Sequence, residues 1–443
     1  MKPSIRLSQC MIVKNEEKNI RQALSWGKGI VFEQIVVDTG STDRTVEIAE
    51  EMGAKIYHFP WINDFSAAKN FAIEQAKGNW IAFLDADEYF IPEDAKKLIP
   101  SLLHVEKTTD SPILPHVIKC AWVHLDDSGK QMSVGVQYRI FRNYSKLRYR
   151  NRIHEYLDLS DGSQLYSCDA IDTLAIFHTG YANSEFNEKK KDVRNITMIQ
   201  KELEEDPDNY MMWAYLGDSL LAAERLEEAE AAYDRATENP YAVVEIDRKN
   251  YSFANWLKSK CFRQVDSGEE FMAVYRRAKK SGCDTPDVDY LAGQWFYNKG
   301  DEIKARQYFE QALQLLEMYK GNDTLVISAS LASVYQKIFA SYAKENRPPE
   351  MVKYGVLALR AELYQPFILK EILILLKREP GEEGTANATF GFLSKLYDLS
   401  VFKNKLFLIK VSEQVPFLAL KEKVEALLSK EEREFVAKSG NIF

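Results

Sequence analysis

The first part of the chain alternates short apolar runs with longer amphipathic stretches. Apolar runs rich in β-branched residues are typical of buried strands, whereas apolar residues recurring every three or four positions indicate helices. The pattern predicts strands within 7–13, 34–44, 54–60 and 79–87, and helices within 15–27, 45–53 and 64–78. Strands that alternate with helices favour parallel pairing, so we expect an open, twisted α/β sheet.

Beyond residue 110 the pattern changes. Apolar runs at 113–125, 137–143 and 175–181 are separated by polar turns such as DDSGK at 126–130. Short connections of this kind favour antiparallel strands. We expect the first domain to extend over residues 1–190, with its later strands antiparallel.

From about residue 196 the pattern is helical throughout and repeats. One tetratricopeptide-like unit is indicated by Trp213, Leu216, Gly217, Ala229, Tyr233, Ala236 and Pro240, a second by Gly293, Phe296, Ala305, Phe309 and Ala312, and a degenerate copy by Ser259, Tyr275 and Ala278. The small residues Gly217, Ser259 and Gly293 are 42 and 34 positions apart, close to the period of about 34 residues in such repeats. We expect helical repeats over 191–345 and a further helical region over 346–443.

Composition narrows the function classes. A net charge of −8 argues against a general binder of nucleic acid. No apolar run approaches the roughly 20 residues that a spanning helix needs, so a cytoplasmic protein without a membrane span is expected. The cysteines (Cys10, Cys120, Cys168, Cys261 and Cys283) are scattered and never in CxxC spacing. This usage is typical of reduced, buried thiols.

Polar residues follow three of the predicted strands. They occur at 14–17, at 38–43, and at Asp85 and Asp87. Acids at one strand end are often only caps, but ligands of open parallel sheets bind where the carboxyl ends of the strands meet. Three such ends together therefore predict a binding site at this edge.

Several ordered motifs resemble family 2 glycosyltransferases of the GT-A fold. They are NEE at 15–17, VVDTGSTDRT at 36–45, the long stretch 63–90 that ends in DADEYF, RIHEYL at 152–157 and IFHTGY at 176–181. The likeness covers about residues 5–185. It implies a Rossmann-like GT-A domain of the nucleotide-diphospho-sugar transferase type, followed by an all-α repeat domain. A transferase domain joined to such repeats is similar to the peptide S-glycosyltransferases of glycocin biosynthesis.

The resemblance also implies which residues bind a nucleotide-sugar donor. Asp38 corresponds to the acid that hydrogen-bonds uracil, and Lys69 occupies a place where the family usually has Arg. Lys for Arg removes the bidentate geometry of a guanidinium. The implied donor-binding residues are Met11, Val13, Glu16, Glu17, Asp38, Lys69, Asn70, Asp85, Ala86 and Arg142. Arg139 and Arg152 are further candidates for screening phosphate charge.

Metal and catalytic roles follow from the same motifs. Asp87 is the last acid of a DxD motif and His178 is the family-like second ligand, together implied to hold Mg²⁺ or Mn²⁺. Such hard cations take oxygen ligands and stabilise a departing diphosphate. For the general base the resemblance favours Glu155, with His154 beside the acceptor or at the metal and Glu88 as the alternative base.

The expected function is an inverting, metal-dependent transfer of a sugar, with UDP-glucose as the leading donor, to a peptide acceptor. A Cys or Ser of a bacteriocin precursor is the acceptor that the resemblance favours. The helical repeats suit either peptide capture or a homodimer. Two alternatives stay open. The acceptor can be a cell-envelope or lipid-linked saccharide, or the protein can be a repeat scaffold with an inactive transferase domain, which the intact Asp38, Asp85 and Asp87 disfavour.

Overall fold

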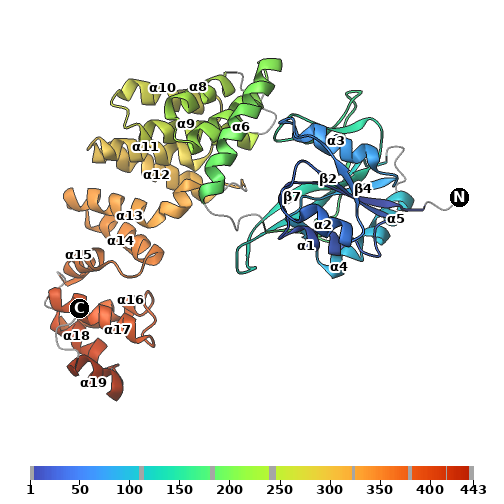
Figure 1. The fold of residues 1–443 in the computed structure, drawn as a ribbon. Helices are drawn as coiled ribbons and strands as arrows, with labels where there is room; N and C mark the ends of the chain where they lie inside the picture. The colour runs from blue at the N-terminus through green and yellow to red at the C-terminus, as the bar shows by residue number, and fades with distance from the viewer. Residues whose placement is uncertain are drawn as a thin grey trace. The chain divides into compact units, whose positions relative to one another are not determined.

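The computed structural model describes residues 4–108, 114–179, 185–238, 246–321, 325–377, 382–415 and 417–438. The chain divides into two compact units, residues 1–224 and 225–443. Figure 1 shows an α/β part followed by helices, so the expected fold class is confirmed. The first unit extends past residue 190 because it includes two helices, α6 (Glu185–Glu205) and α7 (Tyr210–Ala222). The division at 190 and 345 stays a prediction.

The first unit is built on a mixed sheet. In its described residues, nine strands form this sheet, with the path β3-β2-β1-β4-β7-β6-β11-β5 and β10 beside β6. The strands are β1 (Leu7–Val13), β2 (Glu33–Asp38), β3 (Lys55–His58), β4 (Trp80–Phe83), β5 (Glu88–Phe90), β6 (Val117–Leu125), β7 (Gln131–Arg142), β10 (Ser167–Asp169) and β11 (Ala175–His178). A separate hairpin pairs β8 (Leu147–Arg150) with β9 (Tyr156–Leu159).

Strand direction agrees with the sequence pattern in the first half and only partly in the second. β1, β2, β3 and β4 pair in parallel, as expected. β7 is antiparallel to β4 and β6, and β5 is antiparallel to β11. The expectation of antiparallel pairing holds for β11 only against β5, because β11 runs parallel to β6. β10, which none of the predicted strands covers, also runs parallel to β6. The long connection after β7 lets the chain return to the end of the sheet where β6 begins.

Helices cover both faces of β4, which is why its sequence is continuously apolar. Trp80 and Ala82 lie in one core cluster, and Ile81 and Phe83 lie in another. The helices that follow the first strands are α1 (Ile20–Ser25), α2 (Thr45–Glu51), α3 (Phe65–Gln75), α4 (Pro92–Ala95) and α5 (Leu98–Thr108). Helix α3 begins where the Asp64 carboxylate accepts a hydrogen bond from the Ala67 amide at 2.8 Å.

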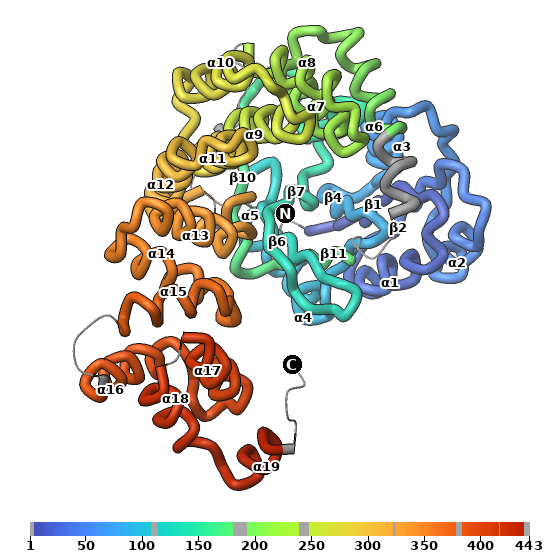
Figure 2. The backbone as a smooth tube through the Cα atoms, turned by 90° about the vertical axis from the view of Figure 1, so that its left-hand side faces the viewer, coloured from blue at the N-terminus to red at the C-terminus, as the bar shows by residue number. Residues whose placement is uncertain are grey.

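The second unit contains only helices among its described residues, and Figure 2 lets the reader follow them in succession. They are α8 (Leu226–Ala236), α9 (Ile246–Phe262), α10 (Gly268–Lys280), α11 (Pro286–Asn298), α12 (Glu302–Met318), α13 (Val326–Lys344), α14 (Pro348–Ala361), α15 (Pro366–Lys377), α16 (Glu382–Leu393), α17 (Phe402–Gln414), α18 (Leu418–Glu425) and α19 (Lys430–Lys438). Gly293 shows why the repeat needs a small residue, because a Cβ there would lie 2.6 Å from the Phe309 ring. Pro240 and Tyr181, both in predicted motifs, lie outside the described residues.

No described helix has the length and apolar character needed to cross a membrane.

Candidate functional site

The loops after β1 and β2 are bound to each other, and this brings two of the predicted strand ends together. Asn15 adopts a left-handed conformation with φ of 58°. Its amide donates to the Ser41 hydroxyl at 2.9 Å, and its side-chain oxygen accepts from the Thr42 amide at 2.8 Å. The Glu16 amide donates to the Thr45 hydroxyl at 2.7 Å. These bonds fix the loops at the carboxyl edge of the sheet.

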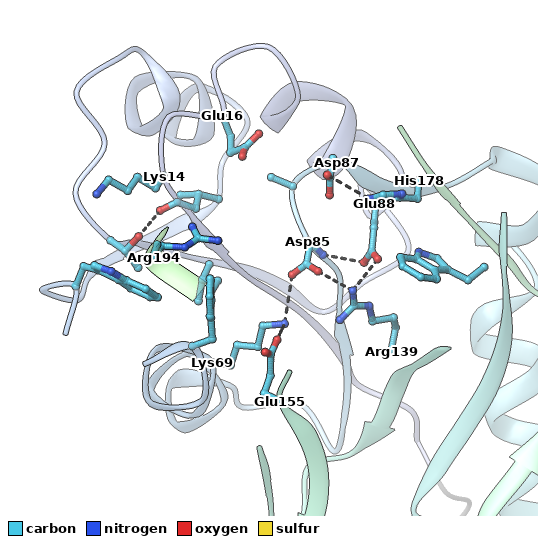
Figure 3. A pocket seen from close by; sticks show the side chains of 17 residues that line it. Lys14, Glu16, Lys69, Asp85, Asp87, Glu88, Arg139, Glu155, His178 and Arg194 are labelled. Atoms are coloured by element: carbon cyan, nitrogen blue, oxygen red, sulfur yellow. Dashed lines mark hydrogen bonds and ion pairs between the residues drawn. The ribbon is translucent and has the colours of Figure 1, made fainter. Parts of the chain in front are cut away.

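A cavity of about 540 Å³ lies at this edge. It is lined by Ile12, Val13, Lys14, Glu16, Thr39, Trp61, Phe65, Lys69, Asp85, Ala86, Asp87, Glu88, Trp122, Arg139, Glu155, His178 and Arg194. Figure 3 shows the charged side chains converging from several elements. The structure therefore brings together Val13, Glu16, Lys69, Asp85, Ala86, Asp87, Glu155 and His178 of the predicted site.

Asp85 is held between two cations. Its carboxylate accepts from Arg139 at 2.6 Å and lies 3.4 Å from the Lys69 ammonium. Burial by itself favours the neutral acid, but the two cations outweigh it and hold the pKa of Asp85 well below its usual range. Asp85 is therefore an ionised acceptor whose orientation is fixed before any ligand binds.

Glu88 has no free oxygen for proton transfer. One oxygen accepts from Arg139 at 2.7 Å, and the other accepts from the Asp85 amide at 2.9 Å. Its side chain is fully buried, and this burial, together with the Asp85 charge, raises the pKa of Glu88. Each Glu88 oxygen therefore already accepts a hydrogen bond within the protein, and the role of Glu88 as the alternative base stays a prediction.

Lys69 connects Asp85 to Glu155. Its ammonium lies 2.6 Å from the Glu155 carboxylate, and the rings of Phe83 and Tyr149 lie 5.3 and 5.2 Å away. Burial opposes the charge, but the Asp85 and Glu155 carboxylates raise the pKa of Lys69. A fully buried ammonium with two carboxylate partners is charged, and it positions Glu155 at the cavity wall.

Asp87 and His178 form a pair that fits a divalent cation. The Asp87 carboxylate lies 3.3 Å from His178 Nε2, and neighbouring ligands around one octahedral ion of this size are separated by about 3 Å. His178 Nδ1 lies 3.2 Å from His124 Nδ1, a partner that can orient the imidazole. Across the described residues, no group of three or more His, Cys, Asp or Glu side chains could by itself hold a metal. The remaining ligands of a metal here would be oxygens of water or of a substrate.

Glu16 adds further negative potential to the same side of the cavity. Burial raises the pKa of the Glu16 carboxyl, and the charges of Asp87, Asp43 and Asp85 raise it further, against a hydrogen bond from Asn19. Carboxylates that disfavour one another's ionisation are stabilised by a cation between them. The donor set of Asp87 and His178, with Glu16 nearby, therefore suits Mg²⁺ or Mn²⁺.

Two predicted donor-binding residues lie outside the cavity for clear reasons. Arg142 is opposite Trp80, at the start of β4, whereas the cavity lies beyond the other end of that strand. It pairs with Glu106 at 2.6 Å and stacks on Trp80. Asn70 exchanges two hydrogen bonds with the Tyr149 backbone and so joins α3 to β8. The structure does not bring these two residues to the cavity wall, and their assignment as donor contacts stays a prediction.

Met11 and Glu17 also do not line the cavity. The Met11 side chain is fully buried in the core, so only its backbone is near the site. The Glu17 amide donates a hydrogen bond to the Asp43 carboxylate, and the Glu17 carboxylate accepts one from the Arg44 amide at 3.3 Å. Their assignment as donor-binding residues stays a prediction.

Asp38 precedes the wall residue Thr39 in the chain and is not itself among the residues that line the cavity. Its carboxylate accepts from the amides of Gly40 and Ser41 and lies 3.4 Å from His58 Nδ1. Burial opposes ionisation, but the Ser41 and Gly40 hydrogen bonds lower the pKa of Asp38. The uracil contact of Asp38 stays a prediction.

His154 is turned away from the cavity. Its backbone is left-handed, with φ of 53°, and its ring stacks on Tyr215 of α7 with centroids 3.7 Å apart. His154 is not among the residues that line the cavity, and its expected place beside the acceptor or metal stays a prediction. Glu155, the next residue, does line the cavity, so the turn separates the two side chains.

Sequence reasoning did not assign several residues of the cavity to the site. Arg139, named only as a further candidate for screening phosphate charge, lines the cavity, and the pairing of Ile140 with Ala82 places it beside the end of β4. His124 lies in none of the motifs of the first subsection, yet it contacts His178. Arg194 lies outside the predicted motifs altogether. No local pattern in the sequence signals these contacts, because each depends on a long-range pairing.

Comparisons with known proteins identify a related family. Residues 8–175 match the model of "Glycosyl transferase family 2". The chain is 32% identical over 230 residues to a TPR repeat-containing protein of Synechococcus elongatus, covering 51% of this chain and 55% of that protein. It is 31% identical over 221 residues to the SPbeta prophage-derived glycosyltransferase SunS of Bacillus subtilis, covering 49% and 50%.

The chain thus spans about half the length of these curated relatives. Among solved structures, glucosyl-3-phosphoglycerate synthase from Mycobacterium tuberculosis with Mn²⁺, UDP and glucosyl-3-phosphoglycerate is 23% identical over 27% of this chain and 44% of that one. Its TM-score of 0.23 is too low to support an argument. The family match is the comparison that bears on function: residues 8–175 of this chain match the model of glycosyl transferase family 2.

Proposed function

We propose that the chain is an inverting, metal-dependent glycosyltransferase that moves a sugar from a UDP-sugar to a peptide. The observation that carries the proposal is the cavity in which Asp87 and His178 lie beside the Asp85–Lys69–Glu155 cluster. These groups provide a cation site, a fixed ionised acceptor and a carboxylate base within one pocket. The family 2 domain supports a nucleotide-sugar donor.

Asp87 and His178 would hold Mg²⁺ or Mn²⁺, and Asp85 would accept hydrogen bonds from ribose or sugar hydroxyls. When bound, the metal supplies positive charge that stabilises the departing diphosphate. Thr39 and Val13 belong to the wall next to Asp38, so the nucleoside is assigned to this side.

Glu155 is the proposed general base. In a single displacement, it takes the proton of the acceptor as the new bond forms at the anomeric carbon and the bond to the diphosphate oxygen breaks. A cysteine thiol needs less help than a hydroxyl, because its pKa is about 8.5. Lys69 fixes one oxygen of Glu155 at 2.6 Å, which orients the carboxylate for this role.

A peptide acceptor is proposed from the sequence resemblance and from the helical repeats, whose stacked helices can form extended binding surfaces. The same surfaces are compatible with a homodimer. The test combines the full chain with UDP-glucose, other UDP- and GDP-sugars, Mg²⁺ or Mn²⁺, and peptides that differ only in Cys, Ser or Ala. We expect a hexose mass shift on the Cys or Ser peptide. Transfer to a lipid-linked saccharide alone would contradict the peptide assignment.

Metal dependence is tested by Asp87→Ala and by EDTA. We expect both to abolish transfer and to weaken UDP binding measured by calorimetry, because each removes the cation site. Asp172→Ala, an exposed carboxylate elsewhere in the domain, is the control and should behave like the wild type. Transfer unaffected by both treatments would overturn the metal mechanism.

The base is tested by Glu155→Gln, which keeps an oxygen for Lys69 but cannot accept the proton. Loss of general-base catalysis is expected to lower kcat by about 10²- to 10⁴-fold, with UDP affinity unchanged. Glu93→Gln at an exposed site is the control. Turnover at the wild-type rate with a hydroxyl acceptor would exclude Glu155 as the base.

A further inference from the structure

One cation of the cavity comes from outside the family domain. Arg194 belongs to α6 (Glu185–Glu205), whereas the family match ends at residue 175. It nevertheless lines the same cavity as Asp85 and Asp87. Figure 3 shows its guanidinium pointing into the space between Lys14 and Asp85.

Helix α6 is attached to the family domain by specific contacts. Arg152 forms ion pairs with Glu205 and Glu202 of α6, and its amide donates to the Glu202 carboxylate at 2.9 Å. The carbonyl of Arg152 in turn accepts from the Phe65 amide at 2.8 Å. The Arg194 guanidinium lies over the Phe65 ring, 5.3 Å from its centroid. The position of Arg194 is thus set by the residues that form the cavity wall.

Arg194 differs from Lys69 and Arg139 in its surroundings: the Arg194 residue is exposed, whereas the Lys69 and Arg139 side chains are largely buried. Lys69 and Arg139 each have carboxylate partners. Within the described part of the chain, no carboxylate lies at ion-pair distance from Arg194, whose polar contact is the Asn195 side-chain oxygen at 3.2 Å. Burial lowers the pKa of Arg194. A partly desolvated guanidinium without an anion leaves its donors available for an anionic ligand.

The arrangement of charge across the cavity indicates which anion this is. Asp87 and His178 form the cation site on one side, and Arg194 and Lys14 provide positive charge on another side. A diphosphate has oxygens that can contact both a metal and a guanidinium, and an Arg fork can bind two of them at once.

We propose that Arg194 binds the diphosphate of the nucleotide donor, so that α6 completes a donor site that the family domain alone leaves short of one cation. This assignment rests on the proposed function. It makes Arg194 a specificity determinant for nucleoside diphosphates over nucleosides, because uridine lacks the group that Arg194 would contact.

The test measures the affinity of the full chain for UDP and for uridine by calorimetry in the presence of Mg²⁺. Arg194→Gln removes the charge and keeps a polar side chain of similar length. A lost hydrogen bond between charged groups weakens UDP binding by about 10- to 150-fold, while uridine affinity should stay unchanged. Lys201→Gln is the matched control, since Lys201 is an exposed cation two turns further along the same helix.

The outcomes separate this inference from the proposed function. Wild-type affinity of Arg194→Gln for UDP would overturn the inference alone. An equal loss of UDP and uridine affinity would show a structural role for Arg194 and would also overturn it, as would an equal loss in Lys201→Gln. If the wild-type chain binds neither UDP nor uridine, the proposed function itself fails.

Discussion

At the scale of single residues, buried charged side chains of the site form ion pairs with side chains of opposite charge. Arg139 is almost entirely buried and contacts both Asp85 and Glu88 through one guanidinium nitrogen. Removing the Arg139 guanidinium lowers the free energy of unfolding, because Asp85 and Glu88 would then be desolvated without a counter-ion. The same matching keeps Asp85 ionised and ready for a ligand, so stability and binding depend on the same contacts.

Arg139→Met tests this coupling. Removing one partner of a buried ion pair costs about 3–5 kcal/mol, so we expect a lower free energy of unfolding in urea and weaker UDP binding. Arg150→Met is the control, because Arg150 is half exposed and lies 3.8 Å from Asp158. If Arg139→Met lowers the free energy of unfolding by less than the control does, Asp85 and Glu88 rearrange to compensate for the missing guanidinium.

At the scale of elements, individual side chains join strands that are distant in sequence. Glu33 at the start of β2 accepts from the Ser8 hydroxyl, the Lys77 amide and the Lys55 ammonium. It thereby connects β1, β3 and the turn before β4. Burial opposes its ionisation, but the bonds from Lys55, Lys77 and Ser8 lower the pKa of Glu33.

The lowered pKa of Glu33 therefore predicts that the stability of the protein depends on pH. The pKa of Glu33 in the folded state is below its unfolded value of about 4.3. Its contribution to the free energy of unfolding is therefore complete above pH of about 4.3 and is lost as the pH falls through the folded-state pKa. The difference in Tm between wild type and Glu33→Gln should be largest near neutral pH and should shrink in acid. Glu74→Gln, at an exposed site, should show no such trend. A difference that grows in acid would contradict this assignment.

Helix packing in the second unit gives a second prediction at this scale. Gly293→Ala would place a Cβ 2.6 Å from the Phe309 ring and 3.1 Å from the Ala305 carbonyl oxygen. Overpacking of this kind costs about 1–3 kcal/mol and should lower the Tm of the full chain. Gly391→Ala in α16, where a Cβ would meet nothing within 4 Å, should instead stabilise by about 0.5–1 kcal/mol through helix propensity. Equal effects of both substitutions would show that α11 and α12 separate easily.

At the scale of the whole molecule, the first compact unit is larger than the family domain. Residues 1–224 include α6 and α7, which supply Arg194 to the cavity, Glu202 and Glu205 to Arg152, and Tyr215 to His154. These contacts make the two helices part of the unit that forms the cavity.

Two truncated chains test this division. The fragment 1–224 is expected to keep the UDP affinity of the full chain, because it retains every described residue of the cavity. The fragment 1–179 should bind UDP more weakly and unfold at a lower temperature, because it loses Arg194 and the partners of Arg152. Calorimetry and thermal unfolding measure both. Equal behaviour of the two fragments would show that α6 and α7 contribute nothing to the site.

The sequence by itself determined the order of elements, the parallel strands β1 to β4, the helical second half and the acidic strand ends. Each of these follows from local periodicity or from a short motif such as Asp85-Ala86-Asp87. Tertiary structure decided which side chains share the cavity. Arg139 and not Arg142 enters it because of the β4–β7 register, and His154 leaves it because its backbone turns toward Tyr215. Arg194 reaches it from beyond the family domain through the contacts of α6 with Arg152 and Phe65. Charge complementarity between residues far apart in the chain has no local signature, so only the fold could reveal it.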